Sequence, residues 1–331
     1  MIKNKIEKIF SKSSGKRICI IGDIMLDRYM LGDVTRISPE APVQVFDIRK
    51  TEPKLGGAAN VSLNIKKLNA EPFLIGIIGK DIEGEVLKQV LKGQGQNING
   101  IIEAEDRPTT CKTRVIASSH HLLRIDSESK REISKDIEKK ILGMLKENVK
   151  EFEIIIMQDY NKGVLTKSLI KSIIAFSKIN KIKILVDPKF DNFFEFKNAF
   201  VFKPNRKEME DAFGRKAKSD EELMKICNEL INKTKCCNLV LTLGEHGMKV
   251  FNKSDGKINI HSIKTRARKV SDVSGAGDTV ISTIAVMLAG GADIIEAVEI
   301  ANIAAGIVVE EVGIVPIEKD NLIRHIKENN Y

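Results

Sequence analysis

The chain has 331 residues, of which 42% are hydrophobic and 30% charged, an ordinary globular composition, and its formal net charge is +9. Its longest weakly polar run, Thr279 to Ala292, is too short to span a bilayer. Residues Met1 to Lys16 lack the apolar core of a signal peptide, and the five cysteines do not have the spacing of a zinc site. The cysteine spacing and the missing signal-peptide core predict a cytoplasmic protein with reduced thiols that does not enter a membrane. Because the basic residues are scattered and only 5% of residues are aromatic, we expect no binding to nucleic acid.

Strand-like apolar runs alternate with helical patterns along most of the chain. Ile2, Ile6, Ile9 and Phe10 recur at helical spacing and predict a short amphipathic helix docked on the body. The alternation is typical of βαβ units, so we expect a single α/β domain over residues 1–331 with a mostly parallel sheet. The expected strands are 17–22, 73–79, 153–158, 182–186 and 238–243, and the expected helices are 58–68, 81–94, 166–179, 279–289 and 293–312.

Two stretches do not fit this alternation. Val43 to Arg49 and Cys111 to Asp126 are β-branched, partly alternating and not interrupted by helices. They predict a small antiparallel flap, made by insertions at about 33–50 and 108–126. Such a flap has exposed edges and one apolar face, which a ligand or a second subunit would cover.

Polar or flexible residues follow four of the predicted strands. They are Asp23, Asp159, Asp187 and Gly244. Ligands of open α/β sheets bind at the carboxyl ends of the strands, although each of these residues alone can also be a simple turn former. Four such ends together favour a binding site at this edge.

The segment Asp272 to Thr279 places an acid beside an anion-binding turn. The sequence Gly275-Ala276-Gly277 lets the backbone approach a ligand without interference from large side chains. The apolar run that follows reads as a helix, whose N-terminal N–H groups and dipole favour a phosphate or a developing negative charge. Asp278 is therefore a candidate general base, and an N-cap Asp on a Gly-rich turn is the alternative.

A second glycine cluster, Gly56-Gly57, opens the helix predicted at 58–68. The glycine pair lets a ligand approach the backbone, and Asn60, one turn into the helix, can hydrogen-bond hydroxyl groups. Tight packing of the helix on a strand explains the glycines equally well.

Asn205 and Glu208 are three residues apart and share one helical face. Both side-chain oxygens can meet a hydrated Mg²⁺ held by nucleotide phosphates. The alternative is a capping box, in which Asn205 caps the helix and Glu208 reaches back to it.

Signatures of other nucleotide-binding and hydrolytic enzymes are absent from the sequence. It contains no P-loop, no third glycine of a dinucleotide fingerprint, no His-Glu-x-x-His and no Gly-x-Ser-x-Gly motif. The five histidines are dispersed and form no pattern for a metal site or a triad.

The order of the motifs resembles the ribokinase-like (PfkB-type) sugar kinases over almost the whole chain. These motifs are Gly22-Asp23, Gly56-Gly57 with Asn60, Asn205-x-x-Glu208 and Gly275-Ala276-Gly277-Asp278. Further runs are similar to the subgroup of D-glycero-β-D-manno-heptose-7-phosphate kinases: Gly22 to Tyr29, Arg36 to Val43, Gly56 to Val61, Pro108-Thr109-Thr110, Lys112-x-Arg114 and Leu123 to Asp126. One departure is Asn161, where Gly is expected, and Asn tolerates positive φ.

The resemblance implies a three-layer α/β/α ribokinase-like fold with a β flap as lid, and ATP-dependent phosphorylation of heptose 7-phosphate at the anomeric O1. It implies a place in ADP-heptose synthesis for lipopolysaccharide core or S-layer glycans. Asp278 would be the base, with the amides of Gly275, Ala276 and Gly277 as anion hole. The implied sugar and sugar-phosphate ligands are Asp23, Asp27, Gly56, Gly57, Asn60, Arg114, Arg124, Asp159, Lys162 and Lys189. The implied ATP-site residues are Asn205, Arg206, Lys207, Glu208, Thr242, Gly244, Gly247 and Asn302, with Asn205 and Glu208 acting on Mg²⁺ through Mg-ATP.

The same resemblance implies ATP and Mg²⁺ as cofactors, allows a monovalent cation such as K⁺, and implies a homodimer formed through the flap. Some family members carry a C-terminal nucleotidyltransferase domain. Because this chain ends at Tyr331 and has no His-x-x-His motif, we expect a kinase-only form, with adenylylation left to another protein. The alternatives are a fructokinase-like or other sugar-phosphate kinase, and a non-catalytic sugar-sensing homologue.

Overall fold

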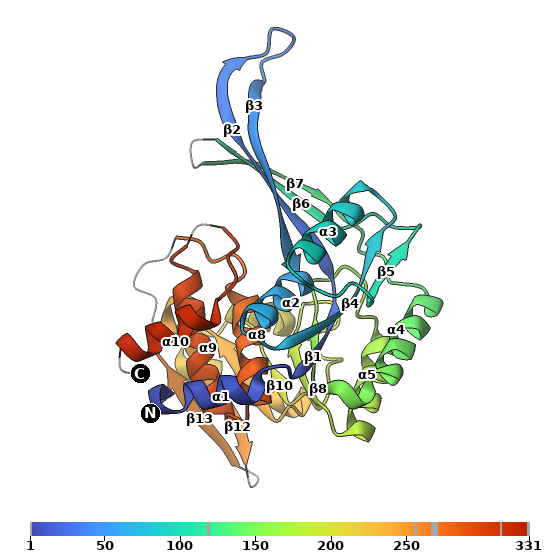
Figure 1. Cartoon of the computed structure of the whole chain (residues 1–331). Coiled ribbons are helices and arrows are strands. Elements are labelled where there is room, and N and C mark those ends of the chain that lie inside the picture. Colours follow the sequence, from blue (N-terminus) through green and yellow to red (C-terminus); the bar gives the residue numbers. More distant parts are fainter. Residues whose placement is uncertain (1, 118–119, 255–256, 266–270, 312, 330–331) are drawn as a thin grey trace.

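A nine-stranded sheet forms the centre of the computed structural model, which describes residues 2–117, 120–254, 257–265, 271–311 and 313–329. Figure 1 shows the sheet between helices, with a long flap projecting from one end. The strands run parallel from β5 to β11, and β12 and β13 add an antiparallel edge. In sheet order the strands are β13 (Lys257–Ile263), β12 (Met248–Ser254), β11 (Asn238–Thr242), β10 (Val201–Phe202), β9 (Lys183–Asp187), β8 (Phe152–Gln158), β1 (Arg17–Gly22), β4 (Glu71–Gly79) and β5 (Ile101–Ala104).

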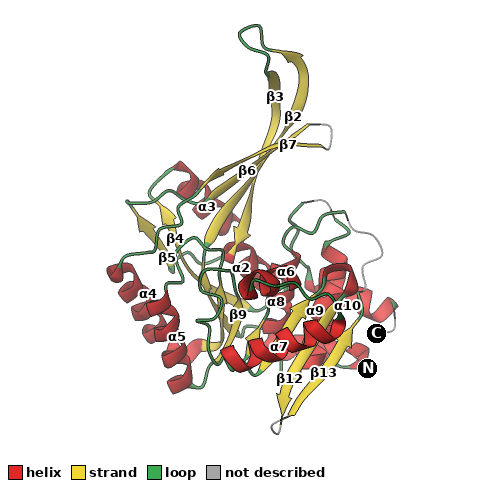
Figure 2. Ribbon diagram, turned by 180° about the vertical axis from the view of Figure 1, so that it is seen from behind, coloured by secondary structure: helices red, strands yellow, loops and turns green. Residues whose placement is uncertain are grey.

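Helices cover both faces of this sheet because the central strands are apolar on both sides. In β1, Ile18 and Ile20 face one hydrophobic layer, and Cys19 and Ile21 face the other. Figure 2 shows the molecule from behind, where the helices that pack on the Cys19 and Ile21 side can be seen. The first layer contains α1 (Ile6–Ser13), α2 (Ala58–Lys67), α3 (Ile82–Gly93), α8 (Ala276–Ala289), α9 (Ile294–Val308) and α10 (Lys319–Glu328), and the second contains α4 (Lys135–Glu147), α5 (Lys167–Asn180), α6 (Arg206–Phe213) and α7 (Asp220–Thr234).

The elements predicted from alternation are present, and their bounds differ by a few residues. Helix α8 begins at Ala276 rather than at Thr279 because Gly275, at φ +81°, ends the preceding loop and serves as N-cap. Helix α9 ends at Val308, and Val312, the predicted end, lies outside the described residues. The mostly parallel three-layer α/β/α architecture is thus confirmed.

The flap is larger than the sequence predicted and its pairing is mixed. It is a four-stranded sheet in the order β3 (Gln44–Gly57), β2 (Ile24–Ile37), β6 (Cys111–Ala117) and β7 (His120–Ser127), with residues 118–119 outside the description. Strands β2 and β6 pair in parallel, so the purely antiparallel expectation was wrong. The start of β2 was missed because Ile24, Met25 and Leu26 are all buried and show no alternation.

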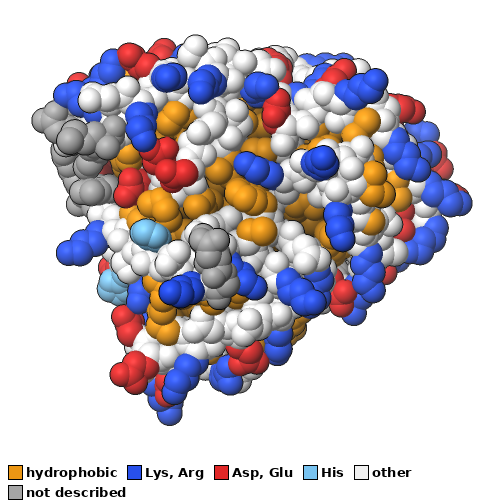
Figure 3. Space-filling view, turned by 90° about the horizontal axis from the view of Figure 1, so that it is seen from below, with side chains coloured by type: hydrophobic (Ala, Val, Ile, Leu, Met, Phe, Trp, Pro, Cys, Tyr) orange, Lys and Arg blue, Asp and Glu red, His pale blue; other side chains and the backbone are white. Residues whose placement is uncertain are grey.

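The surface carries mixed charge. On the face opposite the flap, shown in Figure 3, scattered basic side chains are interspersed with acidic and hydrophobic ones, and no continuous basic stripe is visible. Among the residues that the structure describes, no helix is both long enough and apolar enough to cross a membrane.

Candidate active site

A cavity of about 630 Å³ opens at the carboxyl ends of the central strands. Successive strands deliver polar residues to it: Tyr160 follows β8, Asp187 ends β9, Lys203 follows β10 and Thr242 ends β11. This is the edge at which open α/β sheets bind ligands. The sequence-predicted residues that line the cavity are Lys189, Asn205, Glu208, Thr242, Gly244, Gly247, Gly275, Ala276, Gly277, Asp278 and Asn302.

Asp278 lies in the first turn of α8 and is 4% exposed. Its Oδ2 accepts a hydrogen bond from Asn60 Nδ2 at 2.8 Å. Its Oδ1 accepts hydrogen bonds from Tyr160 Oη at 2.6 Å and Gln158 Nε2 at 3.2 Å. Since Gly275 is the N-cap, and no side chain caps the helix, the capping alternative for Asp278 is not what the structure contains.

The glycines of the turn leave room for this arrangement. A Cβ on Gly275 would lie 3.0 Å from Asn60 Nδ2, and Gly275 has a positive φ that disfavours other residues. A Cβ on Gly277 would lie 3.5 Å from Lys203 Nζ. The Ala276 amide donates to the Val273 carbonyl at 3.2 Å. Other first-turn N–H groups have no partner within a helix, so the turn offers donors to an anion in the cavity.

Burial raises the pKa of Asp278 to about 6, although the hydrogen bonds from Tyr160 and Asn60 act in the opposite direction. The nearby Asp187 carboxylate adds to the increase, and Lys203 opposes it. Asp187 is itself held by Lys203 Nζ at 3.1 Å and by Gln158 Nε2 at 3.1 Å. Asp278 is therefore a buried acid that exchanges its proton near neutral pH, as a general base requires.

Asp159 belongs to the loop after β8 that carries Tyr160, and Asp23, between β1 and β2, contacts this loop. The Asp23 carboxylate accepts backbone hydrogen bonds from Tyr160 at 2.7 Å, Lys162 at 3.1 Å and Val164 at 3.2 Å. Burial and the nearby charge of Asp23 raise the pKa of Asp159 to about 7, and Asp159 Oδ2 has no hydrogen-bond partner among the described residues. In this structure Asp23 orders the loop, and its contact with sugar stays a prediction.

The flap base supplies a second group of predicted sugar ligands. Asp27, in β2, forms an ion pair with Arg114 of β6, and a Cβ on Gly56 would lie 2.1 Å from Asp27 Oδ2. The lower end of the flap also reaches the anion-binding turn. Lys54 Nζ, in β3, donates to the carbonyl of Ile314 at 3.2 Å, and Ile314 lies beside Gly275. Arg114 therefore lies beside Asp27, and its charge also acts on Asp272 in the loop that precedes α8.

Asn205 and Glu208 form the capping box that the sequence left as an alternative. Asn205 Oδ1 accepts from the Glu208 amide at 2.7 Å, and Glu208 Oε2 accepts from the Asn205 amide at 2.8 Å. The second Glu208 oxygen forms an ion pair with Lys189, and all three residues line the cavity. The cap therefore holds the Glu208 carboxylate at the cavity wall.

Four predicted ligands have partners outside the cavity. Arg206 and Lys207 form ion pairs with Glu210 and Asp211 on the exposed side of α6. Arg124, on an exposed strand, binds Asp126 at 2.9 Å, and Lys162 binds Glu128 at 2.7 Å. The structure does not bring any of the four to the lining of the cavity.

Three residues that contact the predicted base or its neighbour were not predicted from the sequence. Gln158 is the last residue of β8, Tyr160 lies two residues after it, and Lys203 directly follows β10. The sequence signal for these three is a polar residue at or just after the end of a strand, the same signal that predicted the acids and Gly244. Their burial beside Asp278 is visible only in three dimensions.

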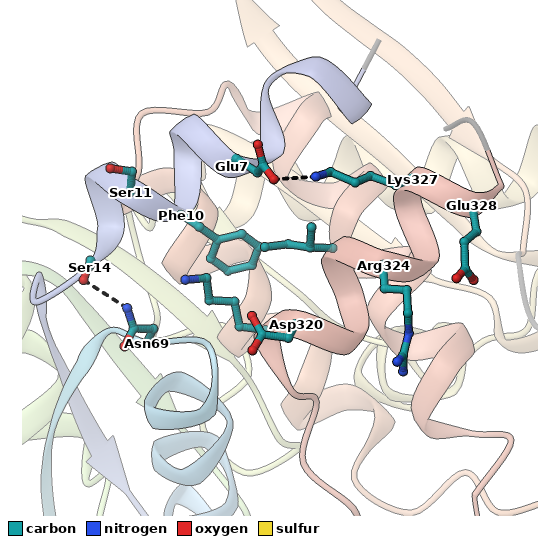
Figure 4. Close-up of a pocket in the computed structure, with 11 residues that line it drawn as sticks. Glu7, Phe10, Ser11, Ser14, Asn69, Asp320, Arg324, Lys327 and Glu328 are labelled. Carbon is teal, nitrogen blue, oxygen red and sulfur yellow. Dashed lines mark hydrogen bonds and ion pairs between the residues drawn. The ribbon is translucent and has the colours of Figure 1, made fainter.

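A second hollow, of about 790 Å³, lies between α1 and α10 (Figure 4). Glu7 pairs with Lys327 across it, with side chains 67% and 42% exposed, and Asn69 Nδ2 donates to Ser14 Oγ at 3.0 Å. We call this hollow the terminal groove. None of the predicted site residues lines it.

Comparison with known proteins agrees with this geometry. The family model described as "pfkB family carbohydrate kinase" matches residues 16–320. The bifunctional protein HldE of Geobacter sulfurreducens is 39% identical over 313 residues, which is 95% of this chain and 63% of that relative, so the chain spans less than two thirds of it.

Solved structures show the same fold at low sequence identity. Phosphofructokinase-2 from Escherichia coli in complex with fructose-6-phosphate superposes with a TM-score of 0.76 at 19% identity, covering 96% of this chain and 100% of that one. Arabidopsis thaliana ribokinase complexed with ribose and ATP gives 0.73 at 18% identity, covering 95% and 99%. These likenesses confirm the expected ribokinase-like fold.

Proposed function

The chain belongs to the pfkB family of carbohydrate kinases, and from this premise we propose that it transfers a phosphoryl group from ATP to the anomeric O1 of D-glycero-D-manno-heptose 7-phosphate. The product would be the 1,7-bisphosphate, a precursor in ADP-heptose synthesis. The observation that carries the proposal is Asp278, a buried acid with a pKa of about 6 at the cavity wall, beside the first-turn amides of α8. The identity to HldE supports the choice of sugar.

The residues of the cavity suit phosphoryl transfer in a simple division of roles. The sugar hydroxyl oxygen attacks the γ-phosphorus of ATP, its proton passes to Asp278, and ADP leaves with the electron pair of the broken bond. The amides of Gly275 to Gly277 and the Lys203 ammonium lie where negative charge on the transferred group needs stabilisation.

We assign the nucleotide to the part of the cavity lined by Thr242, Gly244, Gly247 and Asn302. Bound Mg²⁺ would neutralise phosphate charge, and in proteins it is commonly held by one or two carboxylates together with substrate phosphates. Glu208 fits that pattern, because its carboxylate is fixed at the cavity wall by Asn205. Among the described residues no group of three or more His, Cys, Asp or Glu side chains is arranged to hold a metal ion.

We assign the sugar to the side of Asp278 that faces the flap base, where Asp27 and Asn60 are available to its hydroxyls. Its 7-phosphate requires a cation. We favour Lys189, which lines the cavity, and Arg114, which lies at the flap base; each also pairs with a carboxylate, Glu208 and Asp27 respectively. Arg124, whose side chain is 60% exposed, and Lys162, which pairs with Glu128, lie outside the cavity lining.

A homodimer formed through the flap is part of the proposal. The flap exposes apolar side chains, including Ile48 at 57% and Leu123 at 58%, on an extended sheet whose outer part projects away from the other described elements (Figure 1). A second copy would cover them. Sedimentation equilibrium of the wild type and of Ile48→Glu would test this, and a wild-type monomer would contradict it.

The substrate is tested by steady-state kinetics with Mg-ATP and a panel of sugars. We expect kcat/KM for heptose 7-phosphate to exceed that for the unphosphorylated heptose by about a hundredfold or more, because charge-assisted pairs to a phosphate are worth about 1.5–3 kcal/mol each. Equal values for fructose and heptose 7-phosphate would favour a fructokinase-like enzyme. Binding without turnover would favour a sugar sensor, and rates in K⁺ and Na⁺ buffers would test the monovalent cation.

A further inference from the structure

The two carboxylate oxygens of Asp278 are used unequally. Oδ1 accepts two hydrogen bonds, from Tyr160 Oη at 2.6 Å and from Gln158 Nε2 at 3.2 Å. Oδ2 accepts one, from Asn60 Nδ2 at 2.8 Å. A carboxylate oxygen offers about two acceptor positions. Oδ1 is therefore fully occupied, and Oδ2 retains one position.

Tyr160 is fixed in place at both its backbone and its ring. Its amide donates to Asp23 Oδ2 at 2.7 Å, and the same carboxylate holds the next turn of the loop through Lys162 and Val164. The ring lies 5.4 Å from Lys189 Nζ in a cation–π contact. The Tyr160 hydroxyl therefore reaches Asp278 from a loop whose backbone is held by the buried Asp23 carboxylate.

We propose that Tyr160 is a positioning residue that occupies Oδ1 of Asp278, so that Oδ2 is the atom that takes the proton from the sugar hydroxyl. This rests on the proposed function, since it concerns the base of the same kinase reaction. In the step, the O–H bond of the sugar breaks as its oxygen bonds to the γ-phosphorus, the proton forms an O–H bond with Oδ2, and ADP departs with the bridging electron pair.

The charges around Asp278 are compatible with Tyr160 as a donor. Asp187 ends β9, Lys203 follows β10, and Lys189, paired with Glu208 of α6, lies on the loop after β9. Burial and the Asp278 and Asp187 charges raise the pKa of Tyr160 well above its ordinary value, so its hydroxyl keeps its proton and can donate at neutral pH. The hydrogen bond stabilises the charged carboxylate and lowers the pKa of Asp278.

The test is the pH dependence of kcat for the Tyr160→Phe variant at saturating Mg-ATP and sugar. Loss of the hydrogen bond should move the acidic limb to higher pH, and a shift of about one unit lowers the rate about tenfold below the limb. The plateau kcat should not rise, because Oδ2 remains the acceptor. An increased plateau would mean that Tyr160 blocks the accepting oxygen, and would overturn the assignment.

Two further variants make the result decisive. Gln158→Leu removes the other Oδ1 donor and should move the limb in the same direction, so it carries the test if Tyr160→Phe does not fold. Tyr29→Phe removes the hydroxyl of the other tyrosine that the structure describes, which does not contact Asp278, and its limb should stay in place. A limb that moves in neither Tyr160→Phe nor Gln158→Leu overturns the inference. Failure of the wild type to phosphorylate heptose 7-phosphate would instead defeat the proposed function.

Discussion

The Asp278 cavity and the terminal groove differ in a way that volume does not predict. The two hollows are of similar size, at about 790 Å³ for the groove and about 630 Å³ for the cavity. Its polar groups are exposed and joined in surface ion pairs such as Glu7 with Lys327, whereas Asp278, Asp187 and Lys203 are each 5% exposed or less. Electrostatic interactions between desolvated charges are much stronger than those between solvated charges, so desolvated groups that surround one position can stabilise a transition state there. Matched substitutions in the two hollows test this difference.

The largest effect is expected from Asp278→Asn, which keeps size and hydrogen bonding and removes proton acceptance. We expect kcat to fall by about 10²–10⁴-fold with ATP binding retained, because this is the usual contribution of a positioned acid–base group. Asp320→Asn in the terminal groove is the matched control and should leave kcat unchanged. Steady-state kinetics and ATP titration of both variants measure this, and near-normal kcat in Asp278→Asn would mean that the active site is elsewhere.

The next largest effect is expected on stability, from Lys203→Met. The Lys203 side chain is 4% exposed and pairs with Asp187, so its removal leaves a buried carboxylate without its cation, at a cost of about 3–5 kcal/mol. Lys327→Met in the groove removes a cation that is 42% exposed and should change the melting curve little. Urea unfolding monitored by circular dichroism compares them, and equal midpoints would contradict the distinction between the two hollows.

A pH effect of about tenfold per unit is expected below the pKa of Asp278, which burial raises to about 6. The wild-type rate should rise through this pH as the base loses its proton. Stability should change in the opposite sense: because the folded pKa exceeds the ordinary 3.8, the group favours folding at low pH, and this contribution is lost as pH rises through 6. Asp278→Asn should lack this component, and an unchanged pH profile of its stability would contradict the assignment.

The smallest effect is expected from Glu208→Gln, which keeps the cap acceptor and removes a charge at the cavity wall. Turnover should fall about tenfold and the Mg²⁺ concentration for half-maximal rate should rise, with sugar binding unchanged, because charged hydrogen-bond partners are worth about 1.5–3 kcal/mol. Glu210→Gln, on the same helix but outside the cavity, is the control. If turnover is unaffected, Glu208 serves only as a helix cap; full wild-type turnover in excess EDTA would refute the need for a divalent cation.

Much of the fold could be predicted because the central strands and helices have local signatures. The β1 sequence is apolar from Ile18 to Ile21, and the Gly275 turn marks the start of α8 within three residues. The site could be predicted only in part. Asp278 lies beside a recognisable turn, whereas Tyr160 and Lys203 are ordinary strand-end residues whose role depends on which strands become neighbours in the sheet. The mixed flap pairing of β2 with β6 joins segments that no local pattern connects.

The hydrogen bonds of Asp278 have a consequence for how the protein is made. Asn60 is 218 residues from Asp278 in sequence, and Tyr160 is 118 residues away. The base therefore acquires its partners only after helix α8, near the end of the chain, has docked on strands synthesised much earlier. Contacts of such long sequence separation form late because loop closure costs entropy before they contribute. During refolding, recovery of enzymatic activity should lag behind recovery of helical content, and a nascent chain that has not reached α8 would carry a sheet without its base.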